Sequence, residues 1–304
     1  RNTARGELVL IFPCVERHRH PLLLEVRNTL DLLRLRLGSG QRRQQHLRQF
    51  DADRDEVIQR AREAGVTRIL CAGTDLETSR AALRLAETHP EIYAAVGWHP
   101  NDVASAPPDV RPLLRPLLAH PKTVAVGEIG MDYYRLPGGR RGNGAERDRC
   151  IARQREVFVQ QLELAAEHGL PCVIHQRECF DALWAEFGPF ADRVRAQFHC
   201  FIGSVAELRQ IVGAGSYVSF TGILTYPNAT AVREAVAAAP PDRFFLETDA
   251  PYLPPQGHRG SRCEPAQMIE TARLAADLRG LSIMALDDLT GASARALFPR
   301  LGTW

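Results

Sequence analysis

The chain has 304 residues, of which 45% are hydrophobic and 24% are charged, the balance of a globular protein with a large core rather than of a disordered or fibrous one. Its formal net charge of +2 gives no indication of a broad basic surface for nucleic acid, so any polyanion would have to be held locally. The seven cysteines include no C-x-x-C pair, which argues against a disulfide framework or a zinc finger and favours a reducing, cytoplasmic setting. No apolar run reaches membrane-spanning length, and no secretory signal is recognisable at the N-terminus.

The first 48 residues differ in character from the rest of the chain. They begin without methionine and are crowded with arginine, and only residues 8–12 resemble a strand and residues 29–37 a short helix. We therefore expect an atypical N-terminal segment over residues 1–48 and one regular domain over residues 49–304. No linker or low-complexity tract divides that domain further.

Beyond residue 50 the sequence alternates between apolar runs and segments of helical periodicity. The predicted strands cover residues 66–72, 92–97, 124–126, 171–174, 194–198, 216–220 and 243–246. The predicted helices cover residues 53–64, 76–88, 112–120, 145–168, 179–187, 205–214, 229–238, 264–278 and 283–298. Uniformly apolar strands that alternate with helices are typical of a parallel sheet covered by helices.

This pattern predicts a TIM-type (β/α)8 barrel. Seven strands can be counted after residue 50, and residues 8–12 are the only candidate for the eighth, so the first strand would be atypical. A length of 304 residues is long for an ordinary domain but normal for such a barrel.

Four of these strands end on side chains able to bind a divalent metal, namely Glu128, His175, His199 and Asp249, and a fifth ends on His99. Taken alone, each has an ordinary explanation: a single histidine at a strand end is more often a hydrogen-bonded structural residue, and Asp249 could cap a helix. In a barrel, however, the carboxyl ends of all the strands meet at one mouth. The sequence therefore predicts a metal site there.

The residue types also indicate the chemistry. Mixed imidazole and carboxylate ligands favour zinc, manganese or a similar ion and leave room for water. Two ions bridged by Glu128 could hold a phosphate and supply hydroxide near neutral pH. Asp249 could be both a ligand and the base that orients the attacking water.

Several motifs resemble those of the TatD family of metal-dependent deoxyribonucleases. Residues 126–134 (VGEIGMDYY) resemble the family's (V/L)GE(I/T)GLDYY, and residues 171–177 (PCVIHQR) resemble its PVIVHTR. The other matches are to HCFxGS, SFxGILTFKN, ETD(S/A)PYL and GxHP, at residues 199–204, 219–228, 247–253 and 97–100. The motifs occur in the family's order and cover roughly residues 50–300.

The resemblance implies an amidohydrolase-like barrel that hydrolyses phosphodiesters, typically as a 3′→5′ exonuclease on DNA, with a pair of divalent ions (Mg, Mn or Zn). It gives metal-ligand roles to Glu128, His175, His199 and Asp249, and catalytic roles to Asp249, Glu128 and His99. It makes His99 a substrate-phosphate or proton-transfer residue, and Arg177 and Arg259 phosphate contacts. The substrate would be DNA or another nucleic acid, with no membrane partner, and we expect a monomer.

The chain departs from the family pattern near its N-terminus. The family's first strand ends in a His-x-His pair shortly before a segment like residues 50–55, where this chain has only His46. A His-x-His pair does occur at His18 and His20, some thirty residues too early and with unlike flanks. We hypothesise an abnormal N-terminus, for instance from a misassigned start or a frameshift; the upstream gene read in all frames would test this.

Two alternatives remain open at this stage. The same metal pair could hydrolyse another bond, such as an aminoacyl ester on tRNA or a cyclic amide, because one barrel supports many chemistries. A catalytically impaired barrel with a binding role is the second alternative. Aromatic residues near the mouth could stack on bases and mildly favour nucleic acid, namely Trp98, Tyr133 and Tyr134.

Overall fold

The computed structural model describes residues 9–13, 49–50, 52–137 and 144–301. Within this part of the chain, eight strands form one parallel sheet in the order in which they occur in the sequence. The strands are β1 (Val9–Pro13), β2 (Arg68–Ala72), β3 (Ile92–Val96), β4 (Thr123–Asp132), β5 (Cys172–Arg177), β6 (Ala196–Phe198), β7 (Tyr217–Phe220) and β8 (Phe244–Leu246).

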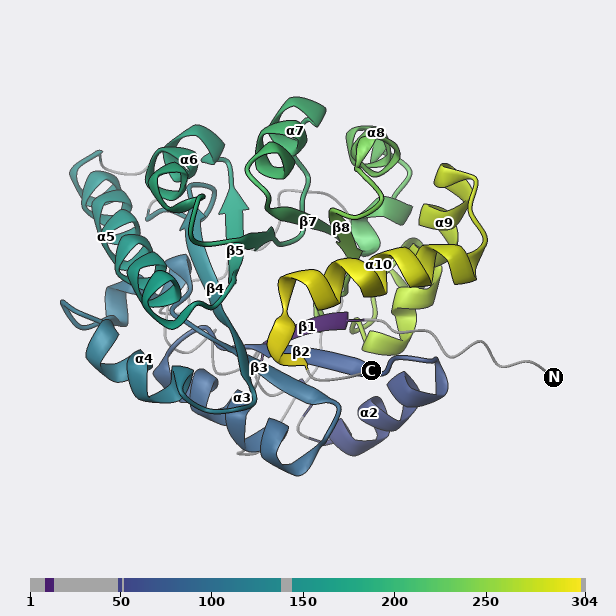
Figure 1. Cartoon of the computed structure of the whole chain (residues 1–304), viewed down its shortest axis with the longest axis horizontal. Helices are drawn as coiled ribbons and strands as arrows, with labels where there is room; N and C mark the ends of the chain where they lie inside the picture. Colours follow the sequence, from purple (N-terminus) through teal and green to yellow (C-terminus); the bar gives the residue numbers. More distant parts are fainter. Residues whose placement is uncertain (1–8, 14–48, 51, 138–143, 302–304) are drawn as a thin grey trace.

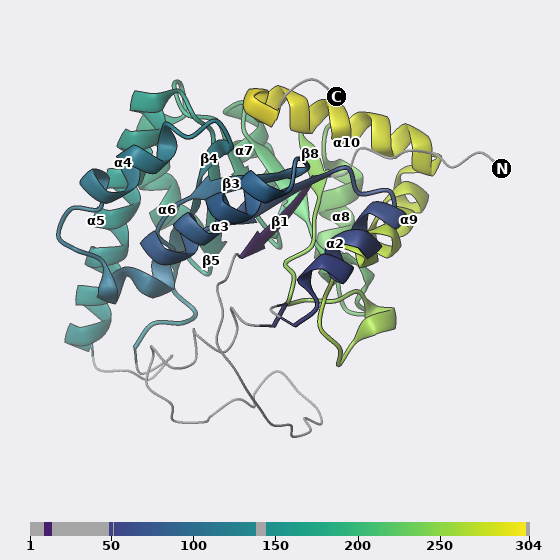
Figure 2. The ribbon, with the colours of Figure 1, turned by 90° about the horizontal axis from the view of Figure 1, so that it is seen from below.

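Helices cover the outside of this sheet, as Figure 1 shows. The helices around the sheet are α2 (Arg54–Glu63), α3 (Leu76–Thr88), α4 (Arg111–Leu118), α5 (Gly144–His168), α6 (Phe180–Phe187), α7 (Val205–Gly213), α8 (Thr230–Ala238) and α9 (Met268–Arg279), and a further helix, α10 (Ile283–Leu297), lies at one end of the barrel (Figure 2). Short 3₁₀ helices lie between them, among them η1 (Pro100–Ser105) and η7 (Pro299–Leu301). None of the helices in the described ranges is both long and apolar enough to cross a bilayer.

The predicted (β/α)8 barrel is confirmed, including its atypical first strand. β1 pairs with β2 in parallel register, from Val9 opposite Arg68 to Pro13 opposite Ala72. The first and last strands, β1 and β8, are also in contact. Residues 9–13 thus supply the strand that the regular part of the sequence lacked.

One end of the barrel is closed by apolar packing. Leu297 and Phe298 from the end of α10 and Leu301 from η7 form a buried cluster with residues inside the sheet, among them Val124 and Phe245. Figure 2 shows α10 lying across this end of the barrel. Phe298 is 1% exposed, so full burial of its ring contributes on the order of 2–3 kcal/mol to folding.

The strands that carry the predicted site are longer than the sequence indicated. The prediction that β4 stops at Gly127 is wrong: the strand runs to Asp132 and includes Glu128, and β5 likewise runs through His175 to Arg177. The pairing of β4 with β5 shifts register between Val126 and Ile129, which accommodates the extra length. Glu128 and His175 therefore lie within strands, and their backbones are fixed by the sheet.

Candidate metal centre

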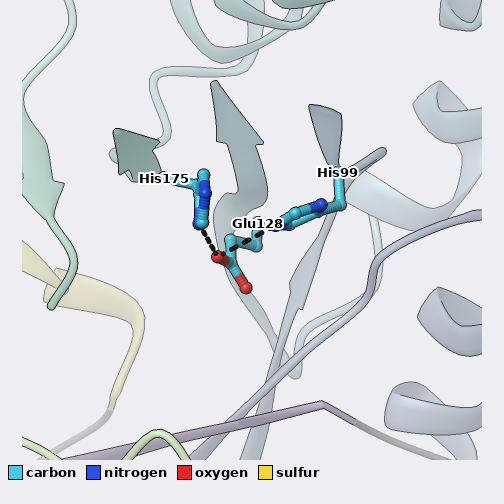
Figure 3. A group of neighbouring side chains, drawn as sticks. All are labelled: His99, Glu128 and His175. Atoms are coloured by element: carbon cyan, nitrogen blue, oxygen red, sulfur yellow. Dashed lines mark hydrogen bonds and ion pairs between the residues drawn. The ribbon is translucent and has the colours of Figure 1, made fainter. Parts of the chain in front are cut away.

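The predicted ligands lie together at the carboxyl ends of the strands. Glu128 comes from β4 and His175 from β5, while His99 lies three residues beyond β3. Figure 3 shows the two imidazoles on either side of the Glu128 carboxylate. One ligand atom from each of these three side chains lies within 4.8 Å of the other two.

Glycines allow the backbones to approach closely enough for this. A Cβ added at Gly97 would lie 2.6 Å from the carbonyl carbon of Gly127, so glycine is required where β3 and β4 meet. Gly130 has φ +132°, and a Cβ there would lie 2.0 Å from the carbonyl oxygen of His175. These contacts hold β4 close to both neighbouring strands and bring their side chains together.

The Glu128 carboxylate is the centre of the cluster. Its Oε1 lies 3.0 Å from His175 Nδ1 and 3.4 Å from His99 Nε2. His199, which directly follows β6, brings its Nε2 to 4.0 Å from the same oxygen. The Nε2 of His199 is also 3.6 Å from Oδ1 of Asp249, which follows β8. The structure thus brings all five predicted residues to one mouth of the barrel.

These separations fit a shared cation. Donor atoms about 2.1 Å from a tetrahedral ion lie about 3.4 Å from one another. The nitrogen–oxygen separations around Glu128 range from 3.0 to 4.0 Å. Imidazole nitrogens and carboxylate oxygens are donors suited to zinc or manganese. The residues therefore fit a metal site of the predicted kind.

The charges of the cluster are mutually stabilised. Burial alone would raise the pKa of the Glu128 carboxyl, but His99, His199 and His175 outweigh it and hold that pKa well below its usual value. Burial alone would lower the pKa of His199, but Glu247 and Glu128 outweigh it and raise that pKa well above 6.5. Asp132 and Glu128 raise the pKa of His175 in the same way. A cation entering this site would compete with protons on His175 and His199, whose pKa values are raised.

Two buried carboxylates behind the cluster were missed by the sequence reasoning. Asp132, which is 0% exposed, lies 3.2 Å from His175 Nε2, and Glu247, which is 1% exposed, lies 2.7 Å from His199 Nδ1. Both stand in motifs quoted above. Membership of the same group of motifs as the histidines is the sequence signal from which the two carboxylates could have been identified.

The other residues that the sequence analysis named differ from one another in their surroundings. The guanidinium of Arg177 stacks 3.8 Å from the centre of the Tyr134 ring, and that of Arg259 lies 4.5 Å from the Tyr226 ring. Trp98 is not available for stacking on a base, since it is buried and its indole nitrogen donates to the carbonyl of Asp102. The N-terminal candidates His18, His20 and His46 lie outside the described residues.

The fold and the donor set define a metal-dependent hydrolase of the amidohydrolase-like barrel class. A family model for TatD-related DNases matches residues 44–299, most of the chain, and the protein belongs to that family. The prediction drawn from the motifs is thereby confirmed.

Individual relatives agree with this assignment. The chain is 36% identical over 253 residues to the uncharacterized metal-dependent hydrolase YabD of Bacillus subtilis, which covers 82% of this chain and 94% of the relative. It is 34% identical over 256 residues to the 3′-5′ ssDNA/RNA exonuclease TatD of Klebsiella pneumoniae, with 82% and 93% covered. The solved structure of the TatD homologue YjjV from Escherichia coli superposes with a TM-score of 0.72 at 28% identity, covering 84% of this chain and 95% of that one.

Proposed function

We propose that this protein is a metal-dependent phosphodiesterase that removes nucleotides from the 3′ end of single-stranded DNA or RNA. The observation that carries the proposal is the buried Glu128 carboxylate with three imidazoles within 4.0 Å of its Oε1. The family assignment, and relatives named as 3′-5′ ssDNA/RNA exonucleases, support this substrate.

In this proposal Glu128, His175, His199 and Asp249 would hold two divalent ions, and Glu128, which lies close to both His175 and His199, would contribute to both. When bound, such ions supply positive charge to the phosphodiester and make water a better nucleophile near neutral pH. Asp249 suits the role of base because its carboxylate is partly exposed at the mouth, whereas Glu128 is buried. The Asp249 carboxylate orients the attacking water and accepts its proton.

His99 has a different role from the other histidines in this proposal. Its Nδ1 accepts a hydrogen bond from the backbone N–H of Asn101 at 3.1 Å. A neutral imidazole has one donor and one acceptor nitrogen, so the proton of neutral His99 sits on Nε2, which faces the cluster. His99 therefore presents a donor to the substrate phosphate or leaving oxygen instead of a lone pair to a metal.

Because the net charge of the chain is only +2, nucleic acid has to be held by local positive charge. Arginines at the rim of the barrel mouth supply that charge. In both stacked pairs, Arg177 on Tyr134 and Arg259 on Tyr226, the aromatic ring fixes the plane of the guanidinium. A fixed guanidinium offers paired donors to a phosphate. We propose that these two arginines bind the backbone of the strand.

A labelled single-stranded oligonucleotide tests the proposal. Protein stripped with EDTA and reloaded with Mn²⁺, Mg²⁺ or Zn²⁺ is expected to release mononucleotides from the 3′ end, and the stripped protein to release none. Bound metal without nucleotide release would contradict the substrate and favour hydrolysis of an aminoacyl ester or a cyclic amide. Neither bound metal nor turnover would favour an impaired barrel with a binding role.

A further inference from the structure

The groups behind each histidine of the cluster differ, and they determine what that histidine can do. An imidazole whose outer nitrogen faces an acceptor carries its proton there and turns a lone pair inward. An imidazole whose outer nitrogen faces a donor turns a proton inward instead. The partner of the outer nitrogen therefore separates a metal ligand from a hydrogen-bond donor.

Behind His175 lies Asp132. The inner nitrogen, Nδ1, is 3.0 Å from Glu128, and the outer nitrogen, Nε2, is 3.2 Å from Asp132 Oδ2. Asp132 is itself fixed: Asn101 Nδ2 donates to its Oδ2 at 3.0 Å, and the backbone N–H groups of Tyr134 and Arg135 each donate to its Oδ1 at 2.9 Å. These three donors hold the acceptor in place independently of His175.

Behind His199 lies Glu247, on the other side of the cluster. The outer nitrogen, Nδ1, is 2.7 Å from Glu247 Oε1, although its N–H bond is not aligned with that oxygen and the contact is an ion pair rather than a well-formed hydrogen bond. Glu247 Oε1 accepts from the backbone N–H of Cys200 at 2.7 Å, and its Oε2 accepts from Gln197 Nε2 at 2.8 Å. Glu247 is thus also held by donors other than the histidine.

His99 provides the contrast within the same site. Its outer nitrogen meets the Asn101 N–H, a donor, and no carboxylate contacts that nitrogen among the interactions of the described residues. A single asparagine therefore serves both arrangements: its side chain fixes Asp132 behind His175, and its backbone fixes the proton of His99.

We infer that Asp132 and Glu247 are positioning residues that turn the Nδ1 lone pair of His175 and the Nε2 lone pair of His199 toward the metal position. The inference rests on the metal site of the proposed function, which it deepens. It assigns a ligand role to two histidines and withholds it from His99, although His99 is as close to Glu128 as a ligand would be. Neither carboxylate touches the substrate position itself.

The test measures metal binding directly. Asp132→Asn and Glu247→Gln keep the size of each side chain but remove the acceptor charge. Each is expected to weaken binding of Co²⁺ to the stripped protein about 10- to 100-fold and to shift the visible absorption of the cobalt-saturated protein. Glu91→Gln is the matched control, because Glu91 is a buried carboxylate paired with Arg62 before β3, at the opposite end of the barrel. It is expected to leave cobalt affinity and spectrum unchanged.

Unchanged cobalt affinity and spectrum in both variants, with the wild type binding cobalt, would overturn the inference. Should either variant fail to fold, Asn101→Ala and Gln197→Met loosen the two carboxylates without altering them, and smaller losses in the same direction are expected. Equal affinity in those variants would also overturn it. Nucleotide release separates the two proposals: a wild type that binds cobalt yet releases no nucleotides sinks the nuclease assignment and leaves the positioning roles standing.

Discussion

The two ends of the barrel are built from the same strands, but their interiors are filled by opposite kinds of side chain. At one end, Phe298 and Leu301 pack against Val124, Tyr217 and Phe245, all of them 3% exposed or less. At the other end, positions that are 6% exposed or less are filled by ionisable or polar side chains, among them Asp132, Gln197, His199 and Glu247.

The difference separates stability from function within one fold. Burying an apolar side chain stabilises the barrel, whereas burying a charge costs free energy unless partners compensate for it. At the polar end Asp132 and Glu247 each accept hydrogen bonds from more than one donor, but the arrangement is costlier than an apolar one. Such a loss of stability is expected where a ligand must be bound.

The largest effect should come from the centre of the polar end. Glu128→Gln removes the carboxylate on which the imidazoles converge. We expect it to lower nuclease activity about 10³-fold, which corresponds to a loss of several kcal/mol of transition-state stabilisation. The circular dichroism spectrum should stay unchanged, because the apolar end is intact. A variant that retains wild-type turnover with Mn²⁺ would contradict the bridging role.

At the apolar end, a substitution should lower the stability of the fold and leave metal binding unchanged. Phe298→Ala leaves a cavity beside Tyr217 and Phe245 and is expected to reduce the free energy of unfolding by about 3–5 kcal/mol. Urea denaturation measures the loss, and cobalt titration of the folded variant should give the wild-type affinity. If the metal affinity fell with the stability, the two ends would not be independent.

Within the polar end, His99 should behave differently from His175. His99→Gln is expected to lower kcat about 10²-fold, the low end of the range for general acid–base catalysis, while metal affinity is retained. His175→Gln should instead weaken cobalt binding. A loss of cobalt affinity in the His99 variant would show that His99 is a ligand and would break the distinction between the histidines.

The metal-free protein should show the charges of the polar end in its pH dependence. The pKa values of His175 and His199 are raised above 6.5 in the folded state, so their contribution to stability is fully present below that pH and is lost as the pH rises through the raised values. The pKa of Glu128 is lowered below 4.5, so its contribution is present above that pH and is lost as the pH falls.

We therefore expect the thermal unfolding midpoint of the stripped protein to be highest between these two limits and to fall toward about pH 9. Adding Zn²⁺ should remove the fall on the alkaline side, because the ion replaces the protons on the histidines. A midpoint that rises steadily with pH in the stripped protein would contradict the charge pairing.

The smallest effect is expected at the rim. Arg177→Lys keeps the charge but loses the planar stack on Tyr134, and should weaken binding of a single-stranded oligonucleotide about tenfold with metal affinity unchanged. Arg193→Lys offers a matched control, since that arginine also stacks on a ring, that of Phe190, away from the cluster. Equal weakening in both variants would point to general charge rather than a specific contact.

Sequence patterns predicted the barrel because apolar strands and amphipathic helices can be recognised from short stretches of sequence. They also predicted the five residues at the mouth, because strand order dictates that strand ends meet. They placed the end of β4 at Gly127, since a glycine followed by a charge reads as a turn; only pairing with β5 shows that the strand continues to Asp132. The roles of Asp132 and Glu247 depend on which nitrogen of a histidine faces which carboxylate, and no local pattern encodes that.

The central claim is that Glu128, His175, His199 and Asp249 hold divalent metal together while His99 does not. Anomalous diffraction from crystals grown with Mn²⁺ or Zn²⁺ tests it most directly. The account predicts anomalous peaks about 2.0–2.3 Å from a Glu128 oxygen, from Nδ1 of His175 and from Nε2 of His199, with none in bonding reach of His99 Nε2. A structure with no metal at Glu128, or with His99 as a ligand in place of His175, would contradict it.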